Sequence, residues 1–238
     1  MNFAIKEIAK ISKFVDFPEN QPLLAIMKHT KQLLKDTKIA LLIEEFGELP
    51  LLTPTKDLFV DILESIVSQQ LSVKASDTIW KRFKILFGKK KMTPRNLLTI
   101  DDEKIRSSGI SYSKIKYMKG LATGIVNKEI DLEALTKLPN EEVLVELTRV
   151  KGIGPWTAEM ILMFSLARED VFSLGDIGLR NAIAKIYEID RDDLKKVAKI
   201  SNKWKPYRTY AARYLWKSLD NLPKPSKTLP EKSPQKGK

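Results

Sequence analysis

Apolar residues recur every three or four positions along most of the chain, which is the spacing of an α-helix with one buried face. The clearest runs are Ile5, Ile8, Ile11 and Val15, and then Leu58, Ile62, Ile66 and Val67. No segment sustains the alternation of a half-buried β-strand, although segments 49–52 and 171–174 are candidates for short extended pieces. The pattern predicts an all-α fold.

Capping residues and glycines divide the predicted helices. Ser72 precedes an apolar segment at 73–87, Pro94 follows Thr93, and Asn140 precedes a segment at 143–147. Ser, Thr and Asn are favoured N-cap residues, and proline suits the first helical turn, so these positions are expected helix starts. The glycines expected to stop or bend helices are Gly88, Gly109 and Gly120.

The charge of the chain favours a polyanionic partner. Its 238 residues are enough for one large domain or two small ones, and 42 Lys and Arg against 30 Asp and Glu give a net charge of +12. Nucleic acid is the first candidate for such a surface. Segment 223–238 holds four Pro and five Lys with one large apolar residue, and is predicted to be a disordered basic tail.

Several classes of site and location are excluded by composition. The chain has no cysteine, which rules out disulfides, thiolate zinc sites, a cysteine nucleophile and a cysteine-ligated iron-sulfur cluster. No His/Asp cluster has metal-ligand spacing, so His29 is given no role, and no nucleotide-binding glycine-rich loop occurs. The apolar runs are too short to span a bilayer, and the first residues do not resemble a signal peptide. We expect an intracellular protein without a membrane partner, cytoplasmic and nucleoid-associated in a prokaryote or nuclear in a eukaryote.

The segment 147–158 predicts two helices joined by a tight hairpin. Gly152 and Gly154 permit a sharp turn and a close approach of backbone amides to a ligand, and Pro155 suits the first turn of the second helix. Amides at a helix N-terminus bind phosphate, and Lys151 adds a positive charge beside them. The alternative is a plain loop between two helices.

The same hairpin contains a candidate cation site. The main-chain carbonyls of Thr148, Val150 and Ile153 could face one monovalent cation, which would help an anionic backbone to dock. No other cofactor is expected.

Several segments in order resemble a known superfamily. Segment 150–158, Val-Lys-Gly-Ile-Gly-Pro-Trp-Thr-Ala, is followed by Asp176 in segment 172–180, Phe-Ser-Leu-Gly-Asp-Ile-Gly-Leu-Arg. This pattern resembles the helix-hairpin-helix, Gly/Pro-rich loop and aspartate signature of the DNA glycosylases, and it is most similar to the 3-methyladenine DNA glycosylase II family. Segments 66–74, 109–117 and 204–216 support the resemblance, which covers roughly residues 40 to 220.

The resemblance implies a fold of two helical subdomains flanking an active-site cleft. We expect residues 1–55 to pack with the C-terminal subdomain and residues 56–140 to form a central helical subdomain. Residues 141–222 are expected to hold the hairpin and the aspartate, ahead of the tail.

Asp176 is the candidate catalytic residue. Cleavage of an N-glycosidic bond builds positive charge on the sugar, and a nearby carboxylate stabilises that charge and orients water. Asp176 also precedes the predicted helix 177–187, where an N-cap role is the simpler explanation, and the two roles are compatible. The catalytic role is what the resemblance implies.

Trp156 stands where strand-cutting relatives have a lysine nucleophile, two residues after the second hairpin glycine. The resemblance therefore implies a monofunctional enzyme that uses water and leaves an abasic site. Lys151 precedes the first glycine and is expected to contact phosphate.

Aromatic residues are needed to hold an extruded base by stacking. The resemblance implies cleft positions for Trp156 and Trp216, and Met160 falls where the family has another aromatic. Tyr210 is a further candidate from the aromatic-rich segment 204–216, although aromatics at helical spacing usually pack in a core.

DNA contacts are expected around two turns. The resemblance places a wedge residue, which fills the gap left by the extruded base, at Gln70 with Gln69 and Leu71 beside it; a solvated surface glutamine is the alternative. The expected contacts at the hairpin are Arg149, Lys151, Gly152, Gly154 and Thr157. Further basic candidates for phosphate are Lys74, Lys114, Lys116, Arg208 and Arg213.

The sequence thus predicts a monomeric DNA glycosylase that excises alkylated bases from damaged double-stranded DNA and passes an abasic site to an endonuclease. Three alternatives stay open. They are a non-catalytic helix-hairpin-helix DNA-binding protein, a bifunctional glycosylase-lyase for oxidised bases, and a basic scaffold or RNA-binding protein.

Overall fold

The computed structural model describes residues 23–220, and every regular element within that range is a helix. The all-α prediction is confirmed. Segments 49–52 and 171–174 are connections without strand pairing. The helix expected at residues 5–15 and the predicted tail lie outside the described residues. None of the described helices combines the length and apolar character needed to cross a membrane.

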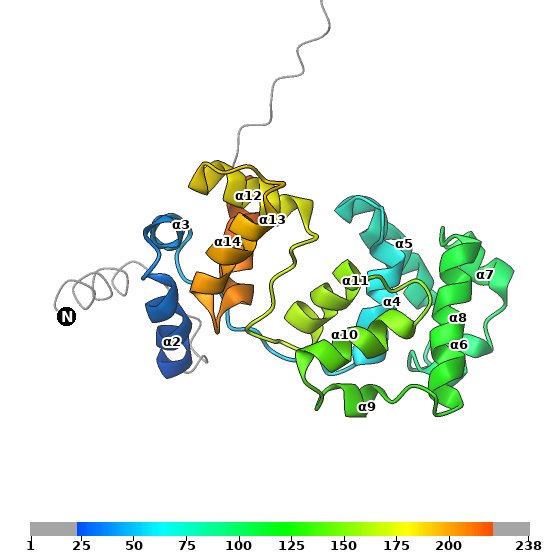
Figure 1. Ribbon diagram of the computed structural model, residues 1–238. Coiled ribbons are helices and arrows are strands. Elements are labelled where there is room, and N and C mark those ends of the chain that lie inside the picture. Colours follow the sequence, from blue (N-terminus) through cyan, green and yellow to red (C-terminus); the bar gives the residue numbers. More distant parts are fainter. Residues whose placement is uncertain (1–22, 221–238) are drawn as a thin grey trace, which may run out of the picture.

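The helices form two groups that lie side by side (Figure 1). The central group contains α4 (Leu58–Ser68), α5 (Val73–Ile85), α6 (Pro94–Leu98), α7 (Asp102–Ser107), α8 (Tyr112–Val126), α9 (Leu132–Leu135), α10 (Asn140–Arg149), α11 (Pro155–Met160) and the π-helix η1 (Ile161–Ser165). The terminal group contains α2 (Leu23–Leu33), α3 (Thr37–Phe46), α12 (Ile177–Tyr187), α13 (Leu194–Ser201), the short 3₁₀ helix η2 (Asn202–Trp204) and α14 (Arg208–Asp220). Two extended segments, 47–57 and 166–176, join the groups.

At two of the three predicted helix starts, a side chain caps the first turn of the helix. Ser72 accepts a hydrogen bond from the amide of Ala75, and Thr93 caps α6 with Pro94 in its first turn, as predicted. Asn140 marks the start of α10, as predicted, but as its first residue, because Pro139 holds the N-cap position without a side-chain hydrogen bond. Glu141 and Glu142 occupy the first turn instead, where negative charge is favourable.

Gly120 does not stop a helix. It is exposed in the interior of α8, and a side chain there would meet open space. Gly88 and Gly109 do lie between helices and adopt positive φ.

Helix α14 forms the centre of the terminal group. It packs against both α3 and α12, and its inward face is aromatic: Tyr210 and Tyr214 are fully buried. In the central group, α8 packs against α4, α6 and α7. Chain segments from both ends of the described range thus build one group, and the middle of the chain builds the other.

The hairpin helices α10 and α11 lie in the central group. They pack against each other, and the continuation of α11 into η1 packs against α4 through buried residues such as Ile161 and Leu162. The chain therefore crosses to the terminal group at 166–176, whereas the predicted subdomain that carries the hairpin and Asp176 begins at residue 141. Apolar burial on α4 holds the hairpin on the central side.

Candidate active site

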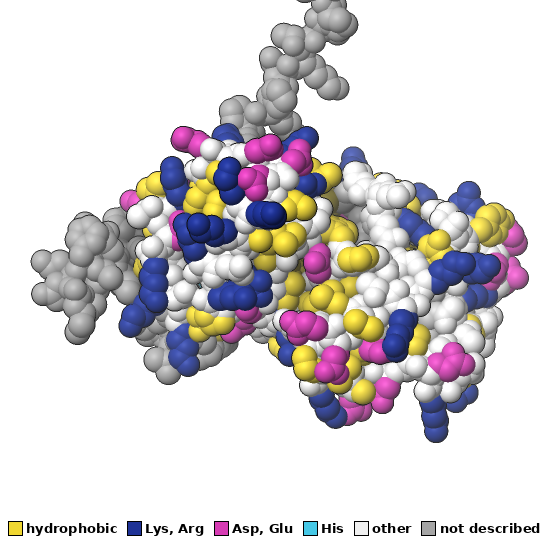
Figure 2. Space-filling model, in the orientation of Figure 1, with side chains coloured by type: hydrophobic (Ala, Val, Ile, Leu, Met, Phe, Trp, Pro, Cys, Tyr) yellow, Lys and Arg dark blue, Asp and Glu magenta, His cyan; other side chains and the backbone are white. Residues whose placement is uncertain are grey.

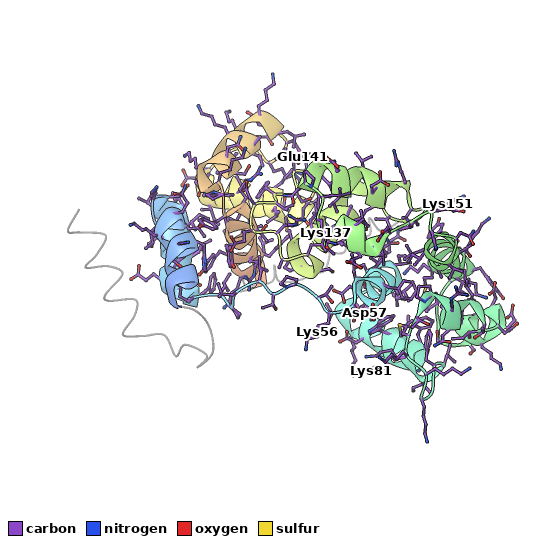
Figure 3. All side chains as sticks on the ribbon, turned by 90° about the horizontal axis from the view of Figure 1, so that it is seen from below. Lys56, Asp57, Lys81, Lys137, Glu141 and Lys151 are labelled. Carbon is purple, nitrogen blue, oxygen red and sulfur yellow. The ribbon has the colours of Figure 1, made fainter. Side chains whose placement is uncertain are left out.

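The hairpin turns at Gly152, which has φ of +95°. A Cβ at this position would lie 2.2 Å from Cδ2 of Tyr117, so the backbone approaches the tyrosine ring more closely than any other residue allows. Gly154 is the N-cap of α11 and Pro155 follows it, with no side chain covering the first amides of the helix. Lys151 is exposed at the tip of the hairpin, between α10 and α8 (Figure 3). The hairpin thus presents free amides and a positive charge on one surface.

Asp176 is the N-cap of α12. Its Oδ1 accepts a hydrogen bond of 2.7 Å from the amide of Leu179, and the residue is only 9% exposed. The capping role predicted as the simpler alternative is therefore confirmed by geometry. This role fixes the carboxylate at the start of the helix, where the helix dipole favours negative charge.

Two indoles complete the environment of the Asp176 carboxylate. Trp156 Nε1, from α11 of the central group, donates to Oδ2 at 2.7 Å, and Trp216 Nε1, from α14 of the terminal group, donates to Oδ1 at 3.2 Å. The carboxylate therefore lies where the two groups meet and receives hydrogen bonds from both. Figure 2 shows hydrophobic side chains gathered along this junction.

The indole rings are open to solvent to different extents. Trp156 is 48% exposed, and Trp216 is half-buried. Phe164, 46% exposed, lies with its ring centroid 6.0 Å from that of Trp216. The sequence gives no signal for Phe164, because this residue lies within the unbroken apolar run 160–164 and nothing local distinguishes it from its neighbours. The π-helical register of η1 decides which residue of that run faces outward.

A second carboxyl group, that of Glu159, lies close enough to Asp176 for the two charges to interact. Glu159 of α11 accepts a hydrogen bond of 2.5 Å through Oε2 from Ser173, which is fully buried in the segment leading to Asp176. Burial raises the pKa of Glu159, the serine hydroxyl opposes this shift, and the charge of Asp176 adds to it. The sequence offered no signal for this pair, because nothing in the spacing of residues 159 and 173 indicates contact.

The predicted DNA contacts divide into free and engaged side chains. Gln70 is exposed with φ of +58°, and Leu71 is 39% exposed. Gln69 is instead turned inward, where its Nε2 donates to the carbonyl of Gly152 at 2.9 Å and to Oγ1 of the buried Thr157 at 3.3 Å. Arg149 is exposed and pairs with Glu146 at 2.6 Å.

Tyr210 is not a cleft residue, which corrects the sequence-based prediction. Its ring stacks on His29 with centroids 3.9 Å apart, and its hydroxyl accepts a hydrogen bond from the amide of Leu52. The aromatic residues of 204–216 at helical spacing mainly face the core of the terminal group, and Trp216 is the one that reaches Asp176. Met160 is half-buried against the core.

Three of the basic candidates are engaged within the protein. Lys114 Nζ donates to the carbonyls of Val67 and Gln69, and Arg208 pairs with Asp170 at 2.6 Å. Arg213 donates to the carbonyl of Pro50 at 2.7 Å. These cations stabilise turns and connections, so the free positive charge near the site is carried by residues such as Lys151.

The carbonyls expected to face a cation lie at the base of the hairpin. The carbonyl of Val150 accepts a hydrogen bond of 3.0 Å from the amide of Ile153 and keeps its second lone pair. Oxygen donors of this kind suit a hard monovalent cation. Within residues 23–220, no cluster of three or more His, Asp or Glu side chains forms a metal site.

A helix-hairpin-helix therefore lies beside a helix-capping carboxylate and exposed aromatic rings. Residues 63–206 match the family model of the HhH-GPD superfamily of base excision DNA repair proteins, and the chain belongs to this superfamily.

One curated relative and two solved structures are similar over most of the chain. DNA-3-methyladenine glycosylase 1 of Schizosaccharomyces pombe is 37% identical over 166 residues, which cover 68% of this chain and 73% of that protein. The crystal structure of DNA-3-methyladenine glycosidase from Bacillus halodurans matches with a TM-score of 0.72 and 34% identity, covering 86% of this chain and 92% of that one. The 3-methyladenine DNA glycosylase of S. pombe in complex with abasic DNA matches with a TM-score of 0.72 and 33% identity, covering 81% of this chain and 97% of that one.

Proposed function

We propose that this protein is a monofunctional DNA glycosylase that hydrolyses the N-glycosidic bond of alkylated bases, such as 3-methyladenine, in duplex DNA. The observation that carries this function is the Asp176 carboxylate, which is held by three donors at the junction of the helix groups beside the exposed ring of Trp156. The names of the relatives support the alkylated-base class.

The chemistry follows from the carboxylate. As the bond between the sugar and the base breaks, the base leaves with the bonding electrons and the sugar acquires oxocarbenium character. Asp176 stabilises this positive charge and orients a water molecule, whose oxygen bonds to the sugar carbon as the carboxylate accepts one proton of the water. Hydrogen bonds from both indoles and from the Leu179 amide hold the carboxylate in place, so little reorganisation is needed during the reaction.

The aromatic rings select the base. An N-alkylated purine carries positive charge, and aromatic faces attract cations by about 0.5–2 kcal/mol. Trp156, Trp216 and Phe164 offer such faces near the carboxylate. Because stacking and charge act on any cationic purine, the site needs no separate hydrogen-bond pattern for each lesion.

Docking on DNA uses the hairpin. The amides of Gly152 and Gly154 bind a phosphate, with Lys151 beside them, and Gln70 enters the DNA duplex in place of the extruded base. A monovalent cation on the carbonyls of residues 148, 150 and 153 would supply positive charge at the same phosphate. Neutralisation of about six phosphates predicts a roughly thousandfold loss of affinity between about 50 and 200 mM salt.

The next enzyme follows from the product, because an abasic site that remains in an intact strand is the substrate of an abasic-site endonuclease. A monomer suffices for the reaction, because both helix groups that form the site belong to one chain.

The test is release of free base from methylated duplex DNA, with strand breakage measured before and after alkali. We expect base release, strands that break only after alkali, and no covalent adduct on borohydride treatment, because Trp156 occupies the position of the lyase lysine. A trapped adduct would instead favour a glycosylase-lyase. Binding without base release would favour a docking protein, and preference for structured RNA would favour the scaffold alternative.

A further inference from the structure

The turn that carries Gln70 is tied directly to the hairpin. The side-chain amide of Gln69 uses its two N–H groups on hairpin acceptors, the carbonyl of Gly152 at 2.9 Å and Oγ1 of Thr157 at 3.3 Å. These residues lie on opposite sides of the hairpin turn, before and after Gly154. A single side chain therefore bridges from the end of α4 to both arms of the hairpin.

Helix α8 holds the same turn from its other side. Lys114 Nζ donates to the carbonyl of Val67 at 2.8 Å and to that of Gln69 at 2.7 Å. Carbonyls at a helix C-terminus lack partners within the helix, so this ammonium caps α4. Burial lowers the pKa of Lys114, and its two short hydrogen bonds stabilise the charged form.

Helix α8 also positions the hairpin. One helical turn after Lys114, the ring of Tyr117 packs on the backbone of Gly152, where no Cβ fits. The end of α4, the hairpin and α8 thus form a closed set of contacts, in which each element touches the other two. The distance between the hairpin and the turn at 69–71 is set by this arrangement.

Gln70 is the residue that this arrangement presents outward. Its backbone lies in the left-handed region with φ of +58°, and its side chain is exposed. A non-glycine residue adopts this conformation at a cost and keeps it where the surroundings hold it. The anchored neighbour Gln69 supplies that constraint.

We propose that Gln69 is a positioning residue for base extrusion, which fixes the spacing between the phosphate-binding hairpin and the wedge residue Gln70. The inference rests on the proposed function and replaces the expectation that Gln69 contacts DNA. A phosphate bound at the hairpin then places Gln70 against one particular base pair, because the two elements move as one body.

The variant Gln69→Met removes both hydrogen bonds and keeps the length of the side chain. Gln32→Met is the matched control, because Gln32 Nε2 donates to two backbone carbonyls, of Lys203 and Lys205, within the terminal group. Each variant is given the same methylated purine in a fully paired duplex and in an unpaired bulge. Extrusion of an unpaired base costs less, so it depends less on a wedge.

We expect Gln69→Met to lower single-turnover release from the paired duplex by about tenfold, the worth of two lost hydrogen bonds. Release from the bulge and the salt dependence of binding to undamaged DNA stay as in the wild type. Gln69→Met combined with Gln70→Ala shows no loss beyond the larger single effect, because both changes disable the same wedge. Gln32→Met releases base from both substrates as the wild type does.

An equal loss on paired and bulged substrates would overturn the proposal, and so would additive effects of the two glutamine changes. If Gln69→Met does not fold, Lys114→Met provides a second variant, which removes the hydrogen bonds to the carbonyls of Val67 and Gln69. It should also release the base from the bulge at the wild-type rate and from the paired duplex more slowly.

Extrusion is also measured without chemistry, from the fluorescence of 2-aminopurine in a duplex bound by each variant. If the wild type releases no base from either substrate, the proposed function fails. A fluorescence increase with the wild type that Gln69→Met abolishes still supports the positioning role, and an equal increase with both rejects it.

Discussion

Two aspartates in this molecule have nearly the same local structure. Asp176 caps α12 and accepts from the indoles of Trp156 and Trp216, while Asp36 caps α3 and accepts from the indole of Trp204 and the hydroxyl of Tyr187. Each carboxylate therefore combines a helix N-cap with aromatic donors.

The difference lies in the aromatic rings. Trp204 is fully buried, packed against Phe172 and Tyr187, whereas Trp156 is 48% exposed. A cavity of about 330 Å³ does adjoin Asp36, but three lysines line it together with Thr37 and Tyr187, and it offers no exposed indole face. A capping carboxylate held by an indole is thus a structural device in one place and a candidate active site in the other. Exposure of the ring distinguishes the two.

The largest expected effect is on base release, when the negative charge of Asp176 is removed and the same change is made at Asp36 for comparison. Asp176→Asn should lower base release by at least about a hundredfold, because one oxygen that accepts from an indole becomes an amino group and the developing positive charge loses its partner. Asp36→Asn should leave release near the wild-type value and lower the free energy of unfolding by about 1–3 kcal/mol. Single-turnover release and urea titration measure the two quantities.

The DNA affinity of Asp176→Asn serves as the control, since the hairpin is unchanged and binding should be retained. Equal losses of base release in Asp36→Asn and Asp176→Asn would contradict the conclusion that Asp176 is catalytic and Asp36 is structural.

Replacing one indole at each aspartate tests the role of ring exposure. Trp156→Phe keeps an aromatic face and removes the donor to Oδ2 of Asp176, so release should fall by about tenfold with little change in stability. Trp204→Phe removes a buried donor and leaves a cavity, which should lower the free energy of unfolding by about 2 kcal/mol. Base release and thermal unfolding of the same preparations give both numbers.

A reversal of this pattern, with stability lost in Trp156→Phe and activity lost in Trp204→Phe, would contradict the assignment of the two sites.

The smallest effect concerns the pH dependence of stability at Glu159. Burial raises the pKa of this carboxyl in the folded protein above its ordinary value of 4.5, so its ionisation opposes folding as pH rises through the raised pKa. Glu159→Gln still accepts from Ser173 and should be more stable than the wild type at neutral pH, with the gain vanishing below about pH 4.5. Near Asp36 the raised pKa belongs to Tyr187, so that site responds at alkaline pH.

Thermal unfolding of the wild type and of Glu159→Gln, recorded from pH 4 to 8, measures this difference in stability. A gain that persists unchanged at the acid end would mean that packing, rather than charge, separates Glu159→Gln from the wild type.

The sequence by itself determined the helical class, the hairpin and the candidate aspartate. Helical periodicity, glycine spacing and capping are local properties, since each depends on residues within one or two turns of each other. The superfamily resemblance rested on the same local segments, and the match over residues 63–206 confirms it.

The tertiary structure alone decided which residues of these segments meet. Tyr210 and Trp216 belong to one aromatic run, yet only Trp216 reaches Asp176, because the ring of Tyr210 is buried in a stack with His29 of α2. Phe164, Glu159 and the inward turn of Gln69 depend on contacts between helices distant in sequence. Periodicity specifies that a face is apolar, and only packing specifies whether a given side chain faces the core, a neighbouring helix or the solvent at the junction of the two groups.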